Sequence, residues 1–303
     1  MPDLSQRESG EGAGTGGKRE GTVMACVGRL GPVKVKSLGF RTDLMLREMA
    51  GALIADHASH VVVRTPANPG FWWGNFVLFN APPRKGDASR WSAVFSGEFP
   101  DAAHLALGVD GTDGDAGDET ELAELGVTTE VSSVLTATRL MPPARPRTDI
   151  TMRPLTSDDD WAQALELRLA CHDDGPLTAD YRRFVEEKVT EDRMLCAAGH
   201  GTWFGAFVDG GLRSGAGLFS DGSGLARFQS VETHPGYRRQ GLASSLVHHI
   251  GHWGLHTLGA RTLVIVADLD YHAIRIYRAL GFADAERQVQ LHRSPASAED
   301  SRD

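Results

Sequence analysis

Alternation of apolar and polar residues, interrupted by changes to a helical period, predicts strands and helices along most of the chain. Residues Leu225 to Val231 alternate in the manner of a β-strand. A helical spacing then follows, with apolar residues at Leu242, Leu246, Ile250 and Trp253. The period changes within a short basic turn of small residues. This strand, turn and helix are the feature around which we interpret the rest of the chain.

The first half contains further predicted elements. Its patterns predict helices at residues 41–50, 87–99 and 119–125, and strands at residues 59–64, 71–80, 104–109 and 131–140. On the strand 71–80, one face would carry Phe71, Trp73, Val77 and Phe79. Asp87 is predicted to cap the helix that follows.

The second half begins after the proline-rich segment Pro142–Arg147, which we interpret as a linker. Strands are predicted at residues 150–154, 202–209, 213–220, 228–234, 262–267 and 288–292, and helices at 157–169, 179–188, from 241 and at 276–282. Ser157 is the expected cap of the first helix. Gly210 and Gly211 would turn a hairpin.

The order of elements in the first half resembles that in the second half. A strand, helix, strand, short helix and strand from residue 72 to 140 correspond to the same series from residue 228 to 292. The sequence therefore predicts a degenerate internal repeat. The expected organisation is a glycine-rich tail at residues 1–30, a first domain at 31–145 and a second domain at 146–303.

Composition narrows the classes of protein. The chain has 303 residues, 41% of them hydrophobic, and a net charge of −9, which disfavours a general nucleic-acid or membrane-surface role. Cys26, Cys171 and Cys196 are isolated, which predicts reduced thiols. With no apolar run of membrane-spanning length, a cytoplasmic protein without a membrane or nucleic-acid partner is expected, as a monomer or homodimer.

Two other patterns in the sequence resemble ligand sites. Gly12–Lys18 fits the glycine-rich phosphate loop superficially, but Arg19 replaces the required Ser or Thr and no strand precedes the glycines. His248, His252 and His256 recur every four residues. Two of them could share a zinc ion, but the sequence has no HExxH glutamate and no obvious third ligand, so no metal is expected and the histidines could form a solvated face.

The basic turn has the properties of an anion site. Arg238 and Arg239 bring two cations, and Gly241, Ala243 and Ser244 have little side-chain bulk at the first turn of the helix. A helix N-terminus offers unpaired N–H groups and the positive end of its dipole. The turn is therefore predicted to bind a diphosphate.

At this point the sequence resembles a known family. Arg238-x-x-Gly241-x-Ala243 matches the Arg/Gln-x-x-Gly-x-Gly/Ala motif of the GNAT superfamily of acyl-CoA-dependent N-acyltransferases. Asp270-x-x-Ala273-Ile274-x-x-Tyr277-x-x-x-Gly281-Phe282 resembles its second motif. The resemblance implies an α/β fold of two GNAT-like domains, each a mixed, mostly antiparallel twisted sheet flanked by helices.

The resemblance also implies acetyl-CoA as the acyl donor, with no metal. The residues expected to contact it are Val231, Thr233, Arg238, Arg239, Gln240, Gly241, Leu242, Ala243, Ser244, Asp270, Ala273 and Tyr277. Asp270 stands where the family usually has asparagine; it can cap a helix but cannot donate an amide hydrogen bond.

Three groups are candidates for the chemistry. Glu232 would serve as the general base for the amine, with His234 as the runner-up; each could instead be an ordinary strand or surface residue. Tyr277 matches the position of the family's general acid, and otherwise would pack against the cofactor or core. Backbone N–H groups around Val231 and Thr233 would polarise the thioester if the strand is bulged.

The first copy lacks these features. Pro82 and Pro83 remove amide donors from its equivalent turn, and no tyrosine matches Tyr277. Trp72, Trp73, Asn75 and Phe76 could line a substrate cleft between the copies or belong to the core.

The sequence thus predicts an N-acetyltransferase whose second domain transfers acetyl to a primary amine, on a small molecule or a peptide, by direct attack. The alternative is a catalytically silent acyl-CoA-binding or interaction module.

Overall fold

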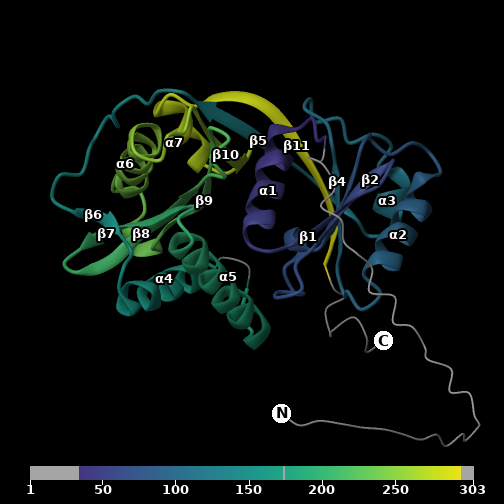
Figure 1. Cartoon of the computed structure of the whole chain (residues 1–303), viewed down its shortest axis with the longest axis horizontal. Coiled ribbons are helices and arrows are strands. Elements are labelled where there is room, and N and C mark those ends of the chain that lie inside the picture. Colours follow the sequence, from purple (N-terminus) through teal and green to yellow (C-terminus); the bar gives the residue numbers. More distant parts are fainter. Residues whose placement is uncertain (1–33, 173–174, 295–303) are drawn as a thin grey trace, which may run out of the picture. The chain divides into compact units, whose positions relative to one another are not determined.

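The computed structural model describes residues 34–172 and 175–294 (Figure 1). These residues fall in one structural unit, Pro32–Asp303. The predicted tail at residues 1–30, with Cys26 and the Gly12–Lys18 segment, lies outside the described residues.

Helices and strands follow one another along the chain in the following order. The helical segments are α1 (Leu38–Met49), η1 (Trp72–Gly74), α2 (Asp87–Glu98), α3 (Thr120–Glu124), α4 (Asp158–Ala170), α5 (Ala179–Ala197), η2 (Pro235–Tyr237), α6 (Leu242–His256) and α7 (Ala273–Ala279). The strands are β1 (Leu53–Asp56), β2 (His60–Arg64), β3 (Phe76–Phe79), β4 (Leu105–Val109), β5 (Thr128–Ala137), β6 (Thr151–Pro154), β7 (Gly201–Val208), β8 (Gly211–Phe219), β9 (Leu225–Thr233), β10 (Thr262–Asp268) and β11 (Ala283–Arg293).

The strands form one 11-stranded sheet in the order β1-β2-β3-β4-β11-β5-β10-β9-β8-β7-β6. β3 is parallel to β4, and β9 is parallel to β10. The other neighbouring strands pair in antiparallel fashion. The predicted mixed, mostly antiparallel α/β fold with flanking helices is therefore confirmed.

The two copies of the predicted repeat exchange their last strands. In the first copy the series is β3-α2-β4-α3-β5, and in the second it is β9-α6-β10-α7-β11. β5 pairs with β10 of the second copy, whereas β11 reaches across to pair with β4 of the first (Figure 1). β5 and β11 also pair with each other. The sheets of the two copies are continuous for this reason.

Each copy has its own apolar core on the shared sheet. In the first copy, Trp91 and Phe95 of α2 pack with β2, β3 and β4. In the second, Leu246 and Ile250 of α6 are fully buried with β9 and β10. The helical period seen in the sequence from Leu242 is thus the face that α6 turns to the sheet.

The predicted strand at residues 71–80 is wrong in its first part. Trp72–Gly74 form a 3-10 turn, and only Phe76–Phe79 are extended. The Asn75 side chain stabilises the turn: its Oδ1 accepts from the Thr65 N–H at 2.9 Å, and its Nδ2 donates to the Asn68 and Phe71 carbonyls. β3 is buried on both faces, so the predicted single apolar face does not exist.

The predicted ends of α2 and α5 differ from the structure, whereas the predicted start of α4 is confirmed. Asp87 is the first residue of α2 and not its cap; Gly86 holds that place, and the Asp87 carboxylate accepts from the Arg84 N–H. Ser157 does cap α4, in a reciprocal capping box with Asp160. α5 extends to Ala197, because Glu191 and Asp192, which resemble solvent-facing residues in the sequence, are buried in ion pairs.

Across residues 34–172 and 175–294, none of the helices is both long and apolar enough to cross a membrane.

The strand exchange predicts that the halves depend on each other. Residues 34–145 expressed alone would lose β11, and residues 146–294 would lose β5, which exposes the edges of β4 and β10. We expect each half alone to aggregate or to lack a cooperative thermal transition by circular dichroism. Co-expressed halves should copurify and regain one transition. Two separately soluble halves, each with its own transition, would contradict this arrangement.

Candidate active site

The turn before α6 adopts a backbone suited to an anion. Arg239 has φ 63° and Gly241 has φ 82°, both in the left-handed region. Gly241 occupies the N-cap position of α6, and no side chain caps that end. The N–H groups of the first turn of α6 therefore receive no side-chain cap and can bind a ligand.

The turn is braced from two sides. Gln240 Nε2 donates to the Gly236 carbonyl at 3.2 Å, and Arg147 Nη1 donates to the Gln240 carbonyl at 3.1 Å. A Cβ atom on Gly241 would lie 3.1 Å from the Arg145 carbonyl oxygen. Glycine is favoured there both by its positive φ and by the close approach of the linker.

β9 carries a bulge immediately before this turn. Gln229 pairs with Gly217 and Glu232 pairs with Gly215, so Ser230 and Val231 lie opposite a single residue of β8. Ser230 has φ 42°, which is strained for a non-glycine residue.

The bulge coincides with the separation of β9 from β10. The parallel pairing ends at Arg227 opposite Val264. In the described part of the sheet, β10 therefore does not pair with the section of β9 from Ser230 to Thr233. The backbone N–H groups on that side of the section are not used for strand pairing. We expected backbone N–H groups near Val231 and Thr233 to polarise the thioester only if β9 is bulged. The structure contains that bulge.

A cavity of about 240 Å³ lies where these features meet. It brings together most of the predicted site residues: Val231, Glu232, Thr233, Arg238, Arg239, Gly241, Leu242, Ala243, Ser244, Ala273 and Tyr277. Gln240 and Asp270 are not part of its wall. His234 is also outside the wall, and its Nδ1 accepts from the Gly236 N–H at 3.2 Å. The walls further include Arg168, Cys171, Tyr181, Tyr271 and His272, which sequence reasoning missed.

Asp270 does not cap α7, so that prediction is wrong. α7 begins at Ala273, with His272 at the N-cap position and no side-chain cap. Asp270 is exposed, and its N–H donates to Asp268 Oδ1 at 2.8 Å. Asp270 lies two residues before the N-cap position of α7. Tyr271 and His272 take the place in the cavity wall.

Tyr277 lies on the inner face of α7 and is 5% exposed. It packs edge-on to Phe282, with 6.4 Å between ring centroids. Burial, with Tyr271 adding to it, raises the pKa of the Tyr277 phenol above its ordinary value. The phenol is therefore protonated at neutral pH and can donate a proton or a hydrogen bond into the cavity.

Glu232 is held by an ion pair. Arg168 Nε donates to Glu232 Oε1 at 3.0 Å, and the Glu232 side chain is 18% exposed. Burial raises the pKa of the Glu232 carboxyl, and Arg168 only partly opposes that shift. A carboxylate with a raised pKa is a stronger base than an ordinary surface glutamate.

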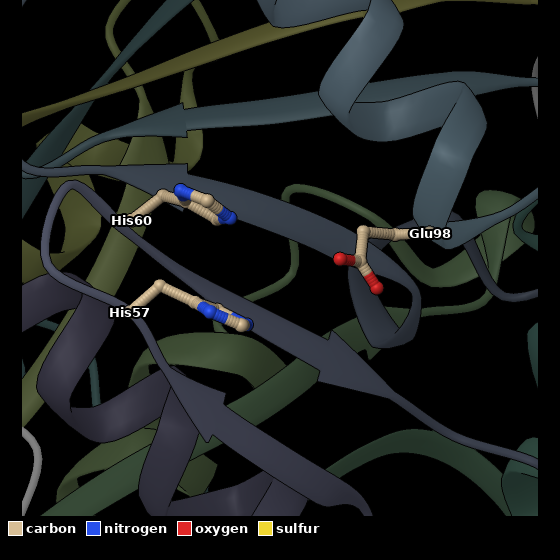
Figure 2. Close-up of side chains that lie close together, drawn as sticks. All are labelled: His57, His60 and Glu98. Carbon is tan, nitrogen blue, oxygen red and sulfur yellow. The ribbon is translucent and has the colours of Figure 1, made fainter.

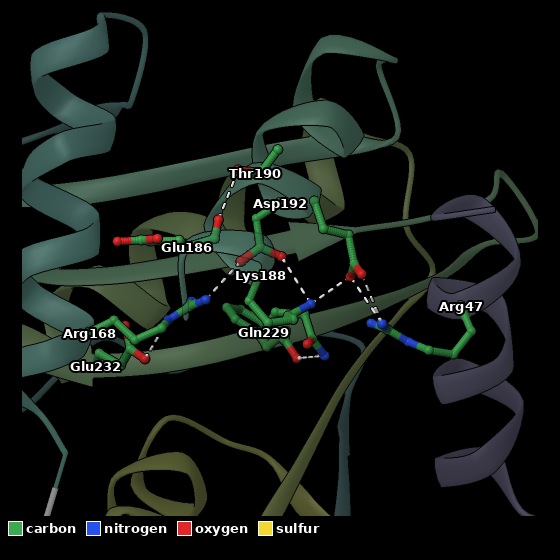
Figure 3. Close-up of polar contacts among 10 residues, drawn as sticks. Arg47, Arg168, Glu186, Lys188, Thr190, Asp192, Gln229 and Glu232 are labelled. Atoms are coloured by element: carbon green, nitrogen blue, oxygen red, sulfur yellow. Dashed lines mark hydrogen bonds and ion pairs between the residues drawn. The ribbon is translucent and has the colours of Figure 1, made fainter. Parts of the chain in front are cut away.

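The ion pair is one end of a buried chain of alternating charges (Figure 3). Arg168 Nη1 contacts Asp192 at 3.1 Å, Lys188 contacts Asp192 at 3.6 Å and Glu191 at 2.5 Å, and Glu191 contacts Arg47 of α1 at 3.0 Å. Burial lowers the pKa of Arg168, but the Glu232 and Asp192 carboxylates outweigh this and raise it. Glu232 is thereby connected to the first copy.

Cys171 also faces the cavity, and its Sγ donates to the Thr233 carbonyl at 3.4 Å. Burial, with the negative charge of Glu232, raises the pKa of this thiol to about 11. Cys171 is thus a neutral thiol at physiological pH and is not activated as a nucleophile.

Possible metal ligands gather elsewhere. The side chains of His57, His60 and Glu98 of the first copy lie close together (Figure 2), with ligand atoms within 4.8 Å of one another. None of the three lines the cavity. Arg64 already forms an ion pair with Glu98. His248, His252 and His256 follow one face of α6, with ring centroids 6.3 Å and 4.2 Å apart.

Comparison with known proteins matches this half of the chain to one family. Residues 161–282 match the sequence model of the acetyltransferase (GNAT) family. None of the curated proteins compared with the chain matches it. The match contains both motifs, and the resemblance predicted from them is confirmed.

Solved structures share the fold at low sequence identity. A GCN5-related N-acetyltransferase from Kribbella flavida is 16% identical with a TM-score of 0.60, covering 86% of this chain and 97% of that one. A functionally unknown protein from Staphylococcus epidermidis is 12% identical with a TM-score of 0.62, covering 81% and 95%. A tandem GNAT protein from the clavulanic acid biosynthesis pathway is 15% identical with a TM-score of 0.50, covering 84% and 88%.

Removing Arg168 should destabilise the protein strongly. In Arg168→Ala, the Glu232 and Asp192 carboxylates would stay buried without their cation, which costs about 3–5 kcal/mol of unfolding free energy. The matched control is Arg182→Ala, whose 3.6 Å pair with Glu166 is exposed and contributes about 0–1 kcal/mol. Urea unfolding measures both. Equal losses in the two variants would contradict a buried charge chain.

Proposed function

Because residues 161–282 are an acetyltransferase domain of the GNAT family, we propose that the protein transfers an acetyl group from acetyl-CoA to a primary amine in this domain. One observation carries the proposal: the anion-binding turn, the bulged strand, Glu232 and Tyr277 meet on one cavity. The family supports acyl transfer in general. The donor, the acceptor and the residue roles are our proposal.

The turn suits the diphosphate of acetyl-CoA. Left-handed Arg239 and Gly241 shape the backbone, the N-terminus of α6 lacks a side-chain cap, and Arg238 and Arg239 line the same wall. Backbone N–H groups at a helix N-terminus together with guanidinium groups are a favourable set for phosphate oxygens. Ala243 and Ser244 leave the first helical turn accessible.

Glu232 removes the proton that prevents attack. A primary amine of ordinary pKa, roughly 10.4, is almost entirely an ammonium ion at neutral pH. Glu232 accepts one proton, and the nitrogen lone pair then forms the bond to the thioester carbonyl carbon. Arg168 holds Oε1, which fixes the orientation of the carboxylate towards the cavity.

The bulged section of β9 stabilises the developing oxyanion. Its backbone N–H groups around Val231 are not used in pairing with β10 in the described sheet, and the section forms one wall of the cavity. Preorganised donors of this kind contribute most where charge develops during the reaction.

Tyr277 protonates the departing thiolate as the carbon–sulfur bond breaks. The nitrogen loses its second proton as it becomes a neutral amide, and this proton restores the Tyr277 phenol, while Glu232 releases its own proton to solvent. The raised pKa of its phenol alone would disfavour this transfer. The same wall also raises the pKa of the Cys171 thiol to about 11, so burial disfavours a thiolate there as well. Burial thus disfavours a thiolate in this cavity as well as a tyrosinate, which favours protonation of the sulfur as it leaves. No covalent enzyme intermediate is needed.

Substituting the turn glycine should weaken cofactor binding. Gly241→Ala and the control Gly259→Ala both place a Cβ at a positive φ, 82° and 78°, which costs roughly 1–2 kcal/mol of stability in each. Only Gly241 lies at the proposed diphosphate site and close to the Arg145 carbonyl. Calorimetric titration with CoA should show an affinity about tenfold lower for Gly241→Ala alone. Equal affinities would remove the turn from the cofactor site.

The pH dependence of kcat/KM tests the base. Activity requires unprotonated Glu232, whose pKa lies above its ordinary value, so kcat/KM should fall as the pH drops through that raised pKa. The pH at which kcat/KM falls, the acidic limb of the profile, should stay the same when the acceptor amine is changed. Glu232→Gln should abolish the limb and lower kcat/KM by about 10²–10⁴.

Tyr277→Phe is the matched comparison. It should lower kcat while keeping the limb that Glu232 produces. Both variants should bind CoA like the unmodified protein. If CoA binds but no amine or peptide is acetylated by the unmodified protein, a silent binding module is the correct reading.

A further inference from the structure

Two further cavities adjoin the catalytic cavity, and the proposed chemistry does not use them. The middle cavity, about 370 Å³, shares Arg168, Tyr181 and Glu232 with the catalytic one. The aromatic cavity, about 950 Å³, shares Phe71 and Phe184 with the middle one. Tyr181 belongs to the walls of all three. The walls therefore form a continuous tract that begins at Glu232.

The aromatic cavity is built by both copies. Phe71, Trp72 and Trp73 come from the turn of the first copy, and Tyr181 and Phe184 come from α5 of the second. Phe184 lies 5.7 Å from Phe71 and 5.9 Å from Tyr181 between ring centroids. All five rings are only partly buried. Such a surface binds a planar apolar group well.

Only part of the predicted substrate cleft has this role. Trp72 and Trp73 line the aromatic cavity, as one of the two sequence interpretations held. Phe76 is 1% exposed and belongs to the core of the first copy, and it also lines the middle cavity but not the aromatic one. Asn75 is buried in the hydrogen bonds that stabilise the turn.

The middle cavity has mainly polar and charged walls. Arg227, Gln229 and Gln288 line it together with Glu232. Two of these side chains are held in place by Asp43: Arg227 Nη2 pairs with it at 3.1 Å, and Gln288 Nε2 donates to it at 2.8 Å. Guanidinium and amide groups in a cavity wall suit a polar segment of a ligand better than an apolar one.

We propose that the tract binds the acceptor, and that the acceptor is an elongated primary amine with a polar segment in its middle and an aromatic group at its far end. Its amine lies at Glu232, its polar segment in the middle cavity and its ring among Phe71, Trp72 and Phe184. The inference rests on the proposed acetyl transfer. It gives the first copy, which lacks the cofactor motif, the role of selecting the acceptor.

Two matched acceptors test the proposal: glycyl-phenylalaninamide and glycyl-alaninamide, which differ only in the ring. The kcat/KM for acetylation of the phenyl compound should be about tenfold or more higher, because the ring is removed from water. Trp72→Leu and Phe184→Ala should each reduce that preference, with the alanine compound unaffected. Trp253→Leu, a half-buried tryptophan that lines none of the three cavities, should leave the preference unchanged.

Binding measured without turnover separates this inference from the proposed function. Calorimetry of the CoA-bound protein should show tighter binding of the phenyl compound, and Phe184→Ala, on the accessible face of α5, should remove the difference. Equal binding and equal acetylation of both compounds would overturn the aromatic tract and leave acetyl transfer standing. Selective binding with no acetylation of any amine would support the tract as a ligand site and overturn the proposed function.

Discussion

The exchange of β5 and β11 is the constraint on which the rest of the structure depends. Each strand lies between the two copies and hydrogen-bonds to both, so neither copy completes its sheet alone. The exchange fixes the register of one copy against the other. The aromatic turn at Trp72, α1 and α5 consequently have defined positions around the strand that carries Glu232.

The candidate site exists because β9 departs from regular sheet geometry. The bulge at Ser230 and Val231 and the end of pairing with β10 after Arg227 leave backbone groups that regular pairing would have occupied. The unpaired N-terminus of α6 follows directly along the chain. Strain in a strand and an uncapped helix would each cost stability, and a bound acyl donor can offset both.

The buried charge chain from Glu232 to Arg47 links the two copies by electrostatics as well as by strand pairing. Its charges alternate in sign, so each ion has a partner although it is removed from water. The chain holds the proposed base and forms part of the tract wall. The first copy, although it lacks the turn and the tyrosine, contributes to the site of the second.

The sequence alone determined the parts of the site that are contiguous: the turn and helix from Arg238 to Ser244 and the neighbourhood of Tyr277, because local spacing sets which backbone groups and side chains share one end of a helix. It also indicated the repeat, since element order survives loss of identity. Only the tertiary structure decided the continuous sheet, the pairing of Arg168 with Glu232 and the arrival of Phe71 and Trp72 beside α5. These depend on contacts between residues far apart in the chain, for which local periodicity carries no information, and the buried charges of α5 resembled a solvated face until their partners were in place.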